Sequence, residues 1–314
     1  MSDAESVSSS RRILYGPSGL RAGWRLVIFA AILFVLFATK GLIARRTMHG
    51  VDDVGRFVFN QTTRFLICLI ASWIMARIER RTIAEYGLPW RRMFRGQFWL
   101  GALIGFAALT VLLGFMQAIG VFDFGRIALR GAEIWKWGAL YGAILLIVGL
   151  SEEFFYRGYI QFTLSTGIGF WPAAILWNAY FGFSHYSNAG ETWAGMVNAG
   201  LGGLFFCLLL QRSGNLWMPI GFHMAWDWGQ TFFYGVPDSG IVVPGHLFNS
   251  THSGPVWLSG GSVGPEGSWL FTALLVVLWI VVAAWMRENR YPGSAVRQPS
   301  APQPDVTQKP AIRG

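Results

Sequence analysis

The sequence predicts an all-α membrane protein, a polytopic helical bundle of about eight transmembrane helices. Of its 314 residues, 53% are hydrophobic and only 13% are charged, whereas a soluble domain carries about 25% charged residues. Several stretches are also apolar over enough length to cross a hydrocarbon core of about 30 Å, which takes about 20 residues of helix. Both observations indicate that lipid surrounds most of the chain.

The predicted transmembrane segments differ in strength. Two of them, GALIGFAALTVLLGF and LFTALLVVLWIVVAAW, contain no charged residue, whereas the second segment along the chain contains Arg64. The predicted segments span residues 23–39, 57–75, 98–121, 135–160, 170–186, 196–210, 216–234 and 269–286.

Arginines and lysines in the short loops predict the orientation, because cytoplasmic loops are enriched in both. A cytoplasmic N-terminus places the Arg-rich loop 77–95 inside and the loop 235–268, which has no Lys or Arg, outside. We therefore expect a multi-pass protein, in a bacterial inner membrane, with both termini in the cytoplasm. Four basic residues run against this orientation: Lys40, Arg45, Arg46 and Arg56.

The chain divides by composition into two tails, two groups of helices, one long loop and a last helix. Both tails lack apolar periodicity, and the C-terminal one is rich in proline, so both are expected to be flexible. The predicted parts are a cytoplasmic tail at 1–22, three helices within 23–134, a motif-bearing core at 135–234, an extracytoplasmic glycine-rich loop at 235–268, the last helix at 269–290 and a disordered tail at 291–314.

The net charge indicates which partners to expect, and the cysteines indicate whether disulfides are expected. The formal charge of +9 is spread over predicted cytoplasmic loops and tails, which suits anionic lipid headgroups. The sequence contains no aromatic-and-basic RNA motif and no phosphate-binding loop, so membrane lipids are expected partners and nucleic acid is not. Cys68 and Cys207 both lie in predicted membrane segments, so no disulfide framework is expected.

Three polar motifs interrupt the predicted helices of the core. They are SEEFFYRG at 151–158, FGFSH at 181–185 and HMAWD at 223–227. Ionisable side chains at bilayer depth cost several kcal/mol each, so a membrane protein that keeps them usually uses them in catalysis or transport. The motifs therefore predict a buried functional site.

Helical spacing suggests how the motif residues are arranged. Glu153 and Arg157 are four residues apart, so they share a helix face and can form an ion pair. Glu152 points about 100° away, has no counter-ion in its motif, and is expected to face the bundle interior. Phe181 with His185, and the two ends of HMAWD, repeat the four-residue spacing.

If these faces converge, Glu152, His185, His223 and Asp227 share one pocket in which a glutamate could take a proton from water. Each residue also has a structural explanation. Glu153 with Arg157 is more readily a structural pair, a single histidine is usually a core residue, and Asp227 could simply hold His223. Phe181 is expected to pack, and Glu152 is the hardest to explain by structure alone.

Together the motifs resemble a known pattern. EEFFYR fits E-E-x-x-x-R, FGFSH fits F-x-x-x-H and HMAWD fits H-x-x-x-N/D, in that order and each on a hydrophobic helix. This pattern is similar to that of the CPBP family, the CAAX-protease and bacteriocin-processing intramembrane proteases, also called the Abi family. The resemblance covers about residues 135–234.

The resemblance implies hydrolysis of a peptide bond in a membrane-associated protein or peptide, either with or without a lipid modification. Glu152 would be the general base, and His185 would hold or polarise the water. His223 and Asp227 would orient and stabilise the oxyanion, and Arg157 would brace Glu153. Many relatives have Asn where this chain has Asp227, so Asp227 would be protonated, orient His223 or bind a metal.

Metal use and function class stay open at this point. Two histidines and a glutamate suit zinc, which makes Glu152, His185 and His223 candidate ligands, but the resemblance implies either a glutamic or a metallo-endopeptidase. The cofactor is therefore zinc or none. The alternatives are a non-catalytic scaffold or bacteriocin-immunity protein, and a proton-coupled transporter, which commonly shows internal repeats that this sequence lacks.

Overall fold

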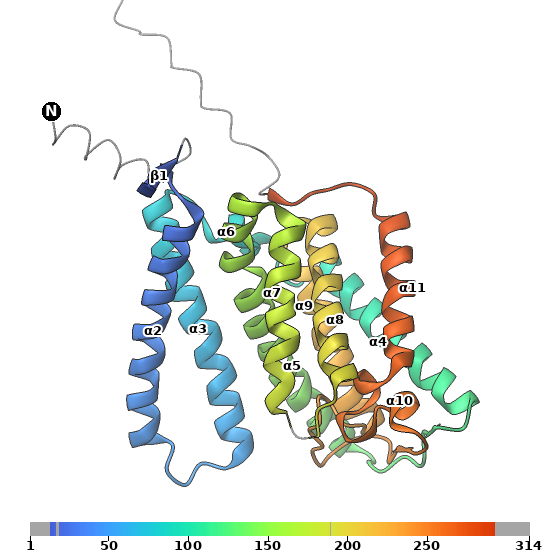
Figure 1. Ribbon diagram of the computed structural model, residues 1–314. Coiled ribbons are helices and arrows are strands. Elements are labelled where there is room, and N and C mark those ends of the chain that lie inside the picture. Colours follow the sequence, from blue (N-terminus) through green and yellow to red (C-terminus); the bar gives the residue numbers. More distant parts are fainter. Residues whose placement is uncertain (1–12, 17–18, 189, 293–314) are drawn as a thin grey trace, which may run out of the picture.

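The computed structural model describes residues 13–16, 19–188 and 190–292, whose regular secondary structure is helical apart from two pairs of two-residue strands (Figure 1). The predicted all-α fold class is confirmed. The predicted tails lie largely outside the described residues. The helices are α2 (Ala22–Thr47), α3 (Asp53–Glu79), α4 (Gly96–Ala118), α5 (Ala132–Arg157), α6 (Tyr159–Ile168), α7 (Phe170–Ser184), α8 (Trp193–Ser213), α9 (Trp217–Trp228), α10 (Val256–Ser259) and α11 (Trp269–Trp285).

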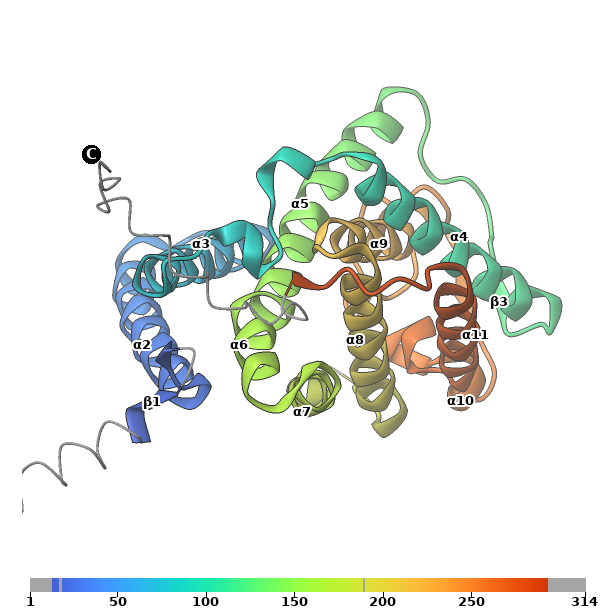
Figure 2. The same ribbon diagram turned by 90° about the horizontal axis from the view of Figure 1, so that it is seen from above.

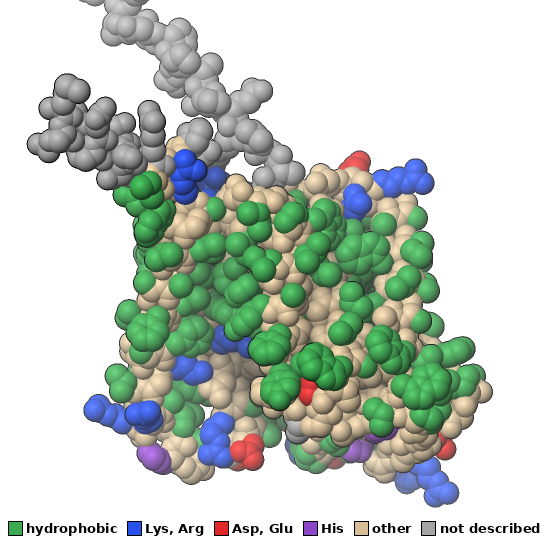
Figure 3. Space-filling model, viewed as in Figure 1, with side chains coloured by type: hydrophobic (Ala, Val, Ile, Leu, Met, Phe, Trp, Pro, Cys, Tyr) green, Lys and Arg blue, Asp and Glu red, His purple; other side chains and the backbone are tan. Residues whose placement is uncertain are grey.

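Each predicted membrane segment contains a helix. Five helical stretches are long and apolar enough to cross a membrane, namely α2, α3, α4, α8 and the continuous run Ala132–Ile168 through α5 and α6. The apolar helix α11 is shorter, and the helices α7 and α9, in the fifth and seventh predicted segments, are shorter still. On the face seen in Figure 3, apolar side chains cover most of the middle of the bundle, and most charged side chains lie toward its two ends, as expected of a multi-pass membrane protein.

The helices α2 and α3 form a hairpin that stands beside the remaining helices (Figures 1 and 2). A buried polar network attaches the hairpin to α6. In this network Arg25 of α2 pairs with Glu79 of α3, and Tyr159 of α6 donates a hydrogen bond to Glu79. Arg25 also donates to Thr166 of α6, over 3.0 Å. These bonds fix the hairpin at the end that carries the N-terminus.

Glycines bring α4 and α9 into close contact. A Cβ atom added to Gly101 would lie 2.1 Å from the carbonyl oxygen of Met218, and one added to Gly105 would lie 2.4 Å from that of Phe222. Small residues allow membrane helices to approach backbone to backbone. This contact sets the position of α9, which carries the HMAWD motif.

Two predicted segments differ from the observed elements. The fourth segment continues past Arg157, but the helix breaks at Gly158 and resumes as α6. The seventh ends in a π-helix, Gly229–Tyr234, that follows α9 directly. Both irregular stretches flank polar motifs, and a hydropathy pattern does not report such breaks.

The loop 235–268 covers one end of the bundle (Figure 1). It contains α10 and the strand β4 (Thr251–His252), which pairs with β3 (Phe122–Asp123) after α4. At the opposite end, Tyr291 is buried and its ring lies 4.7 Å from that of Phe170. The chain therefore stays packed on the bundle at Tyr291, the residue at which the sequence suggested that the tail begins.

Candidate active site

The three polar motifs lie around one cavity of about 650 Å³. Its lining includes Glu152 from α5, His185 at the end of α7, and His223 and Asp227 from α9. A cavity of this size accommodates a drug-sized ligand or a short peptide segment. The structure thus brings together the side chains that the sequence singled out, although their chemical roles stay predictions.

Glu152 faces the cavity as expected, and its counter-ion comes from outside its motif. Arg64 of α3 donates from Nη2 to Glu152 Oε1 over 2.8 Å and from Nε to Ser151 Oγ over 2.6 Å. Both charged side chains are partly buried, at 25% and 20% exposed. The sequence contained a signal for this pair, since Arg64 interrupts an otherwise apolar segment, but 88 residues separate the partners.

Glu153 and Arg157 form the predicted ion pair, with Arg157 Nη1 3.1 Å from Glu153 Oε1, and both side chains are fully buried. Arg157 also donates from Nη2 to Asn178 Oδ1 over 2.7 Å. Its guanidinium lies 4.6 Å from the centre of the Phe181 ring, so Phe181 packs as predicted. A Cβ atom on Gly203 would lie 2.3 Å from Arg157 Nη2, so this position leaves no room for a larger residue.

His223 connects the buried ion pair to the cavity. Its Nδ1 lies 2.8 Å from Glu153 Oε1, and its Nε2 lies 3.4 Å from Asp227 Oδ2. The carboxylate accepts the hydrogen bond, so Nδ1 carries a proton. Glu153 therefore orients His223, a link that helical spacing could not reveal, and the predicted contact between His223 and Asp227 is also present.

His185 presents one nitrogen to the cavity. Its Nδ1 lies 2.9 Å from the carbonyl oxygen of Phe181 and donates to it, and the Phe181 ring meets the imidazole edge to face at 4.8 Å. In the neutral ring Nε2 then carries the lone pair. Among the described residues Nε2 has no hydrogen-bond partner, which suits it to hold a water.

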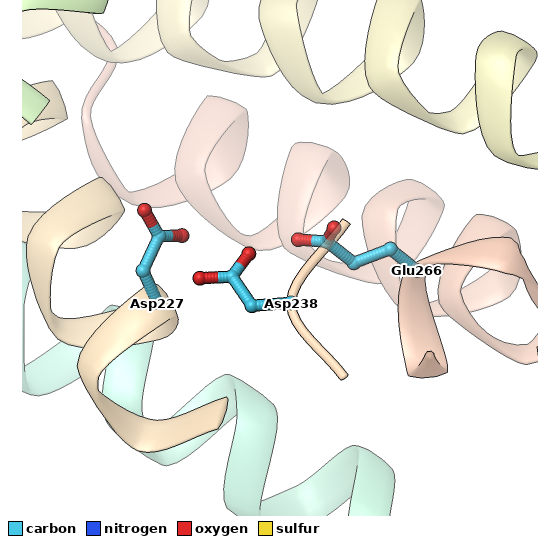
Figure 4. A group of neighbouring side chains, drawn as sticks. All are labelled: Asp227, Asp238 and Glu266. Atoms are coloured by element: carbon cyan, nitrogen blue, oxygen red, sulfur yellow. The ribbon is translucent and has the colours of Figure 1, made fainter. Parts of the chain in front are cut away.

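Two cavity residues outside the motifs were not anticipated. Asp238 and Glu266 of the loop 235–268 point toward Asp227 (Figure 4), and the three carboxylates offer oxygens within 4.8 Å of one another. Glu266 accepts hydrogen bonds from Trp226 at 2.7 Å and Gln230 at 3.1 Å. The loop is thereby attached to α9 through acidic side chains, which a glycine-rich loop did not indicate.

Two donor sets could be considered for a metal. The carboxylates of Asp227, Asp238 and Glu266 are ligands of the kind that Ca²⁺ or Mg²⁺ prefers, although Glu266 already accepts several hydrogen bonds. Among the described residues, Glu152, His185 and His223 do not form a cluster with ligand atoms so close together.

The acidic cluster predicts a pH-dependent attachment of the loop. Burial raises the pKa of Asp238 to about 8, and the neighbouring Glu266 acts in the same direction. The folded protein thus binds this proton more tightly than an unfolded aspartate, with a pKa of about 3.9. The resulting stability is complete below about pH 4 and is lost as the pH rises to about 8.

We therefore expect hydrogen exchange in residues 235–268 to become faster between about pH 4 and pH 8 after correction for intrinsic exchange. Asp238→Asn should flatten this dependence, because the amide does not titrate. Asp123→Asn, on an exposed carboxylate of β3, is the matched control and should behave as wild type. A corrected profile that is the same in wild type and Asp238→Asn would contradict the assignment.

Comparison with known families matches residues 134–229 to a model described as type II CAAX prenyl endopeptidase Rce1-like. The matched range contains all three motifs, whereas Arg64, Asp238 and Glu266 lie outside it. No curated protein and no solved structure matches the chain.

Proposed function

We propose that the chain is a membrane protease of the CAAX type that works through water activated by Glu152, a proposal supported by the match of residues 134–229 to the type II CAAX prenyl endopeptidase Rce1-like model. The match confirms the resemblance to the CPBP family at the level of the family. The proposal extends to the mechanism, the catalytic class and the substrate.

One observation carries the mechanism. Glu152, His185 and His223 come from three helices and line one cavity. Arg64 holds Oε1 of Glu152, while Oε2 has no hydrogen-bond partner among the described residues. A water between this oxygen and Nε2 of His185 would have one acceptor on each side, as a general-base mechanism requires.

The proposed reaction begins when Glu152 takes a proton from the water as its oxygen attacks the carbonyl carbon of the substrate. The resulting oxyanion would be stabilised by the imidazolium form of His223, which donates from Nε2 while Nδ1 donates to Glu153 and sets the orientation of the ring. One such donor is typically worth about 3 kcal/mol. Glu152 then returns the proton to the leaving nitrogen, and the C–N bond breaks to give an amine and a carboxylic acid.

The role of Asp227 in this scheme depends on the groups around it. It lies near His223, and within 4.8 Å of the other two carboxylates of the acidic cluster. Like charges so close together favour retention of a proton within the cluster. A shared proton would allow Asp227 to donate to the oxyanion beside His223.

The lining of the cavity favours an apolar substrate. One wall is formed by Phe57 of α3 and by Tyr141, Ile144, Leu145 and Val148 of α5. Such a wall suits a transmembrane segment or a lipid-modified peptide, because burial of apolar surface favours binding. We therefore propose a membrane-associated substrate, with a lipidated terminus as the form to test first.

The catalytic class is proposed to be glutamic. A metal bound by Glu152 and by Nε2 of His185 and of His223 would share the Glu152 carboxylate with Arg64, while the bond from Nδ1 of His223 to Glu153 would remain. Among the described residues these three side chains do not form a cluster of closely spaced ligand atoms. The metal-free mechanism keeps these bonds and uses the free atoms Glu152 Oε2 and His185 Nε2.

The test uses the full chain in liposomes with a fluorogenic lipidated or transmembrane peptide. We expect cleavage to continue at an unchanged rate after treatment with EDTA and 1,10-phenanthroline, and to be lost in His185→Ala with the thermal midpoint retained. Loss of cleavage on chelation, restored by added Zn²⁺, would overturn the glutamic assignment. Undiminished cleavage in His185→Ala would remove the proposed water site.

A further inference from the structure

Arg64 is the basic side chain of the cavity. Among the described residues that line it, no other is Lys or Arg, whereas six are acidic. Arg64 comes from the α2–α3 hairpin and lies outside the range matched by the family model. The acidic lining residues are Asp53, Glu152, Glu191, Asp227, Asp238 and Glu266.

Among the described residues, the guanidinium of Arg64 forms hydrogen bonds along one of its edges only. Nε donates to Ser151 Oγ and Nη2 donates to Glu152 Oε1, which occupies the edge formed by these two nitrogens. No described residue accepts a hydrogen bond from Nη1. The edge formed by Nη1 and the second hydrogen of Nη2 therefore remains available, and it has the geometry that binds a carboxylate through two parallel bonds.

A purely structural role explains Arg64 less well. The pair with Glu152 is partly exposed to the cavity, and ion pairs in contact with water stabilise a fold little. The hairpin already has a buried attachment through Arg25, Glu79 and Tyr159. The available guanidinium edge is better explained by a ligand that enters the cavity.

We propose that Arg64 is the anion-recognition residue of the site and binds a carboxylate of the substrate close to the bond that is hydrolysed. The inference rests on the proposed function, because it takes Glu152 as the general base. Residues of an extended peptide advance about 3.3–3.6 Å each, so a carboxylate on the free edge lies about one to three residues from a carbonyl group at Glu152. The carboxylate belongs either to the C-terminus of the substrate or to an acidic side chain.

The experiment compares three lipidated peptides that share one cleavage site. The first ends in a free carboxylate, the second in an amide, and the third in an amide with glutamate as its last residue. We expect wild type to cleave the free acid with kcat/KM about tenfold or more above that of the amide, the effect of one charge-assisted hydrogen bond. Arg64→Gln should bring the ratio of the two close to one.

Two further variants separate recognition from folding. Arg64→Lys keeps the charge but lacks the second nitrogen of the fork, so it should retain an intermediate ratio and also serves if Arg64→Gln fails to fold. Arg77→Gln, on an exposed arginine of the same helix that does not line the cavity, should keep the wild-type ratio. A glutamate amide cleaved like the free acid would identify any nearby carboxylate as the ligand, and one cleaved like the plain amide would identify the C-terminus.

Equal cleavage of all three peptides by wild type would overturn the inference. The inference would also be overturned if Arg64→Gln lowered the cleavage of the free acid and of the amide by the same factor, because Arg64 would then only position Glu152. The proposed function would survive either result, provided that Glu152→Gln abolishes cleavage in the same assay.

Discussion

Glu152→Gln is expected to lower kcat for peptide hydrolysis by about two to four orders of magnitude, the usual contribution of a general base. The amide has nearly the shape of the carboxylate and can still accept the hydrogen bond from Arg64, but it cannot take a proton from water. The rate should therefore fall while the protein stays folded. The measurement is single-turnover cleavage in liposomes with the thermal midpoint followed in parallel.

The matched control for this variant is Glu133→Gln, which neutralises an exposed glutamate at the start of the same helix. Glu133 pairs with exposed Lys136 at 3.2 Å and accepts a hydrogen bond from Trp137 at 3.0 Å, and glutamine can still accept the second, so cleavage and stability should both match wild type. Cleavage by Glu152→Gln at the wild-type rate would show that another group activates the water. Loss of folding in Glu152→Gln would point to a structural role for the carboxylate.

Arg157→Met is expected to produce the largest loss of stability, about 3–5 kcal/mol, because it leaves Glu153 as a buried charge without its cation. The side chain of Arg157 is fully buried, and its guanidinium also contacts Asn178 and the Phe181 ring. Methionine has a similar length and fills most of the space, so the loss reports the charge rather than a cavity. Reversible denaturation in mild detergent measures it.

The double variant Arg157→Met with Glu153→Gln provides the internal check. Removing both charges should recover part of the lost stability, since no unpaired carboxylate remains. Exposed Arg92→Met should have almost no effect. If the single and double variants were equally unstable, the loss would come from packing around Phe181 and not from the unpaired charge of Glu153.

The sequence predicted those parts of the site that depend on local geometry. The helical repeat alone places Glu153 beside Arg157, and His223 beside Asp227, and both contacts are present. The apolar segments similarly predicted the helices, because a chain in lipid must satisfy its backbone hydrogen bonds within each segment. The break at Gly158 was missed, since hydropathy does not depend on backbone angles.

Contacts between distant segments could not be predicted. Arg64 interrupts an apolar segment visibly, but nothing in one sequence shows that its partner is Glu152 rather than solvent or lipid headgroups. The link from Glu153 to His223 joins residues 70 apart and requires α5 and α9 to pack face to face. Asp238 and Glu266 stand in a loop of glycines and prolines, where acidic residues usually remain in water.

By itself the sequence determined a multi-helix membrane protein, three polar motifs and the family to which they point, because hydropathy and four-residue spacing are properties of local chain geometry. Only the tertiary structure decided which charged and polar side chains pair with one another in the site. Arg64 pairs with Glu152, Glu153 orients His223, and the loop brings two carboxylates to Asp227. Electrostatic interactions depend on distance in space and on burial, and both quantities arise only when the helices pack.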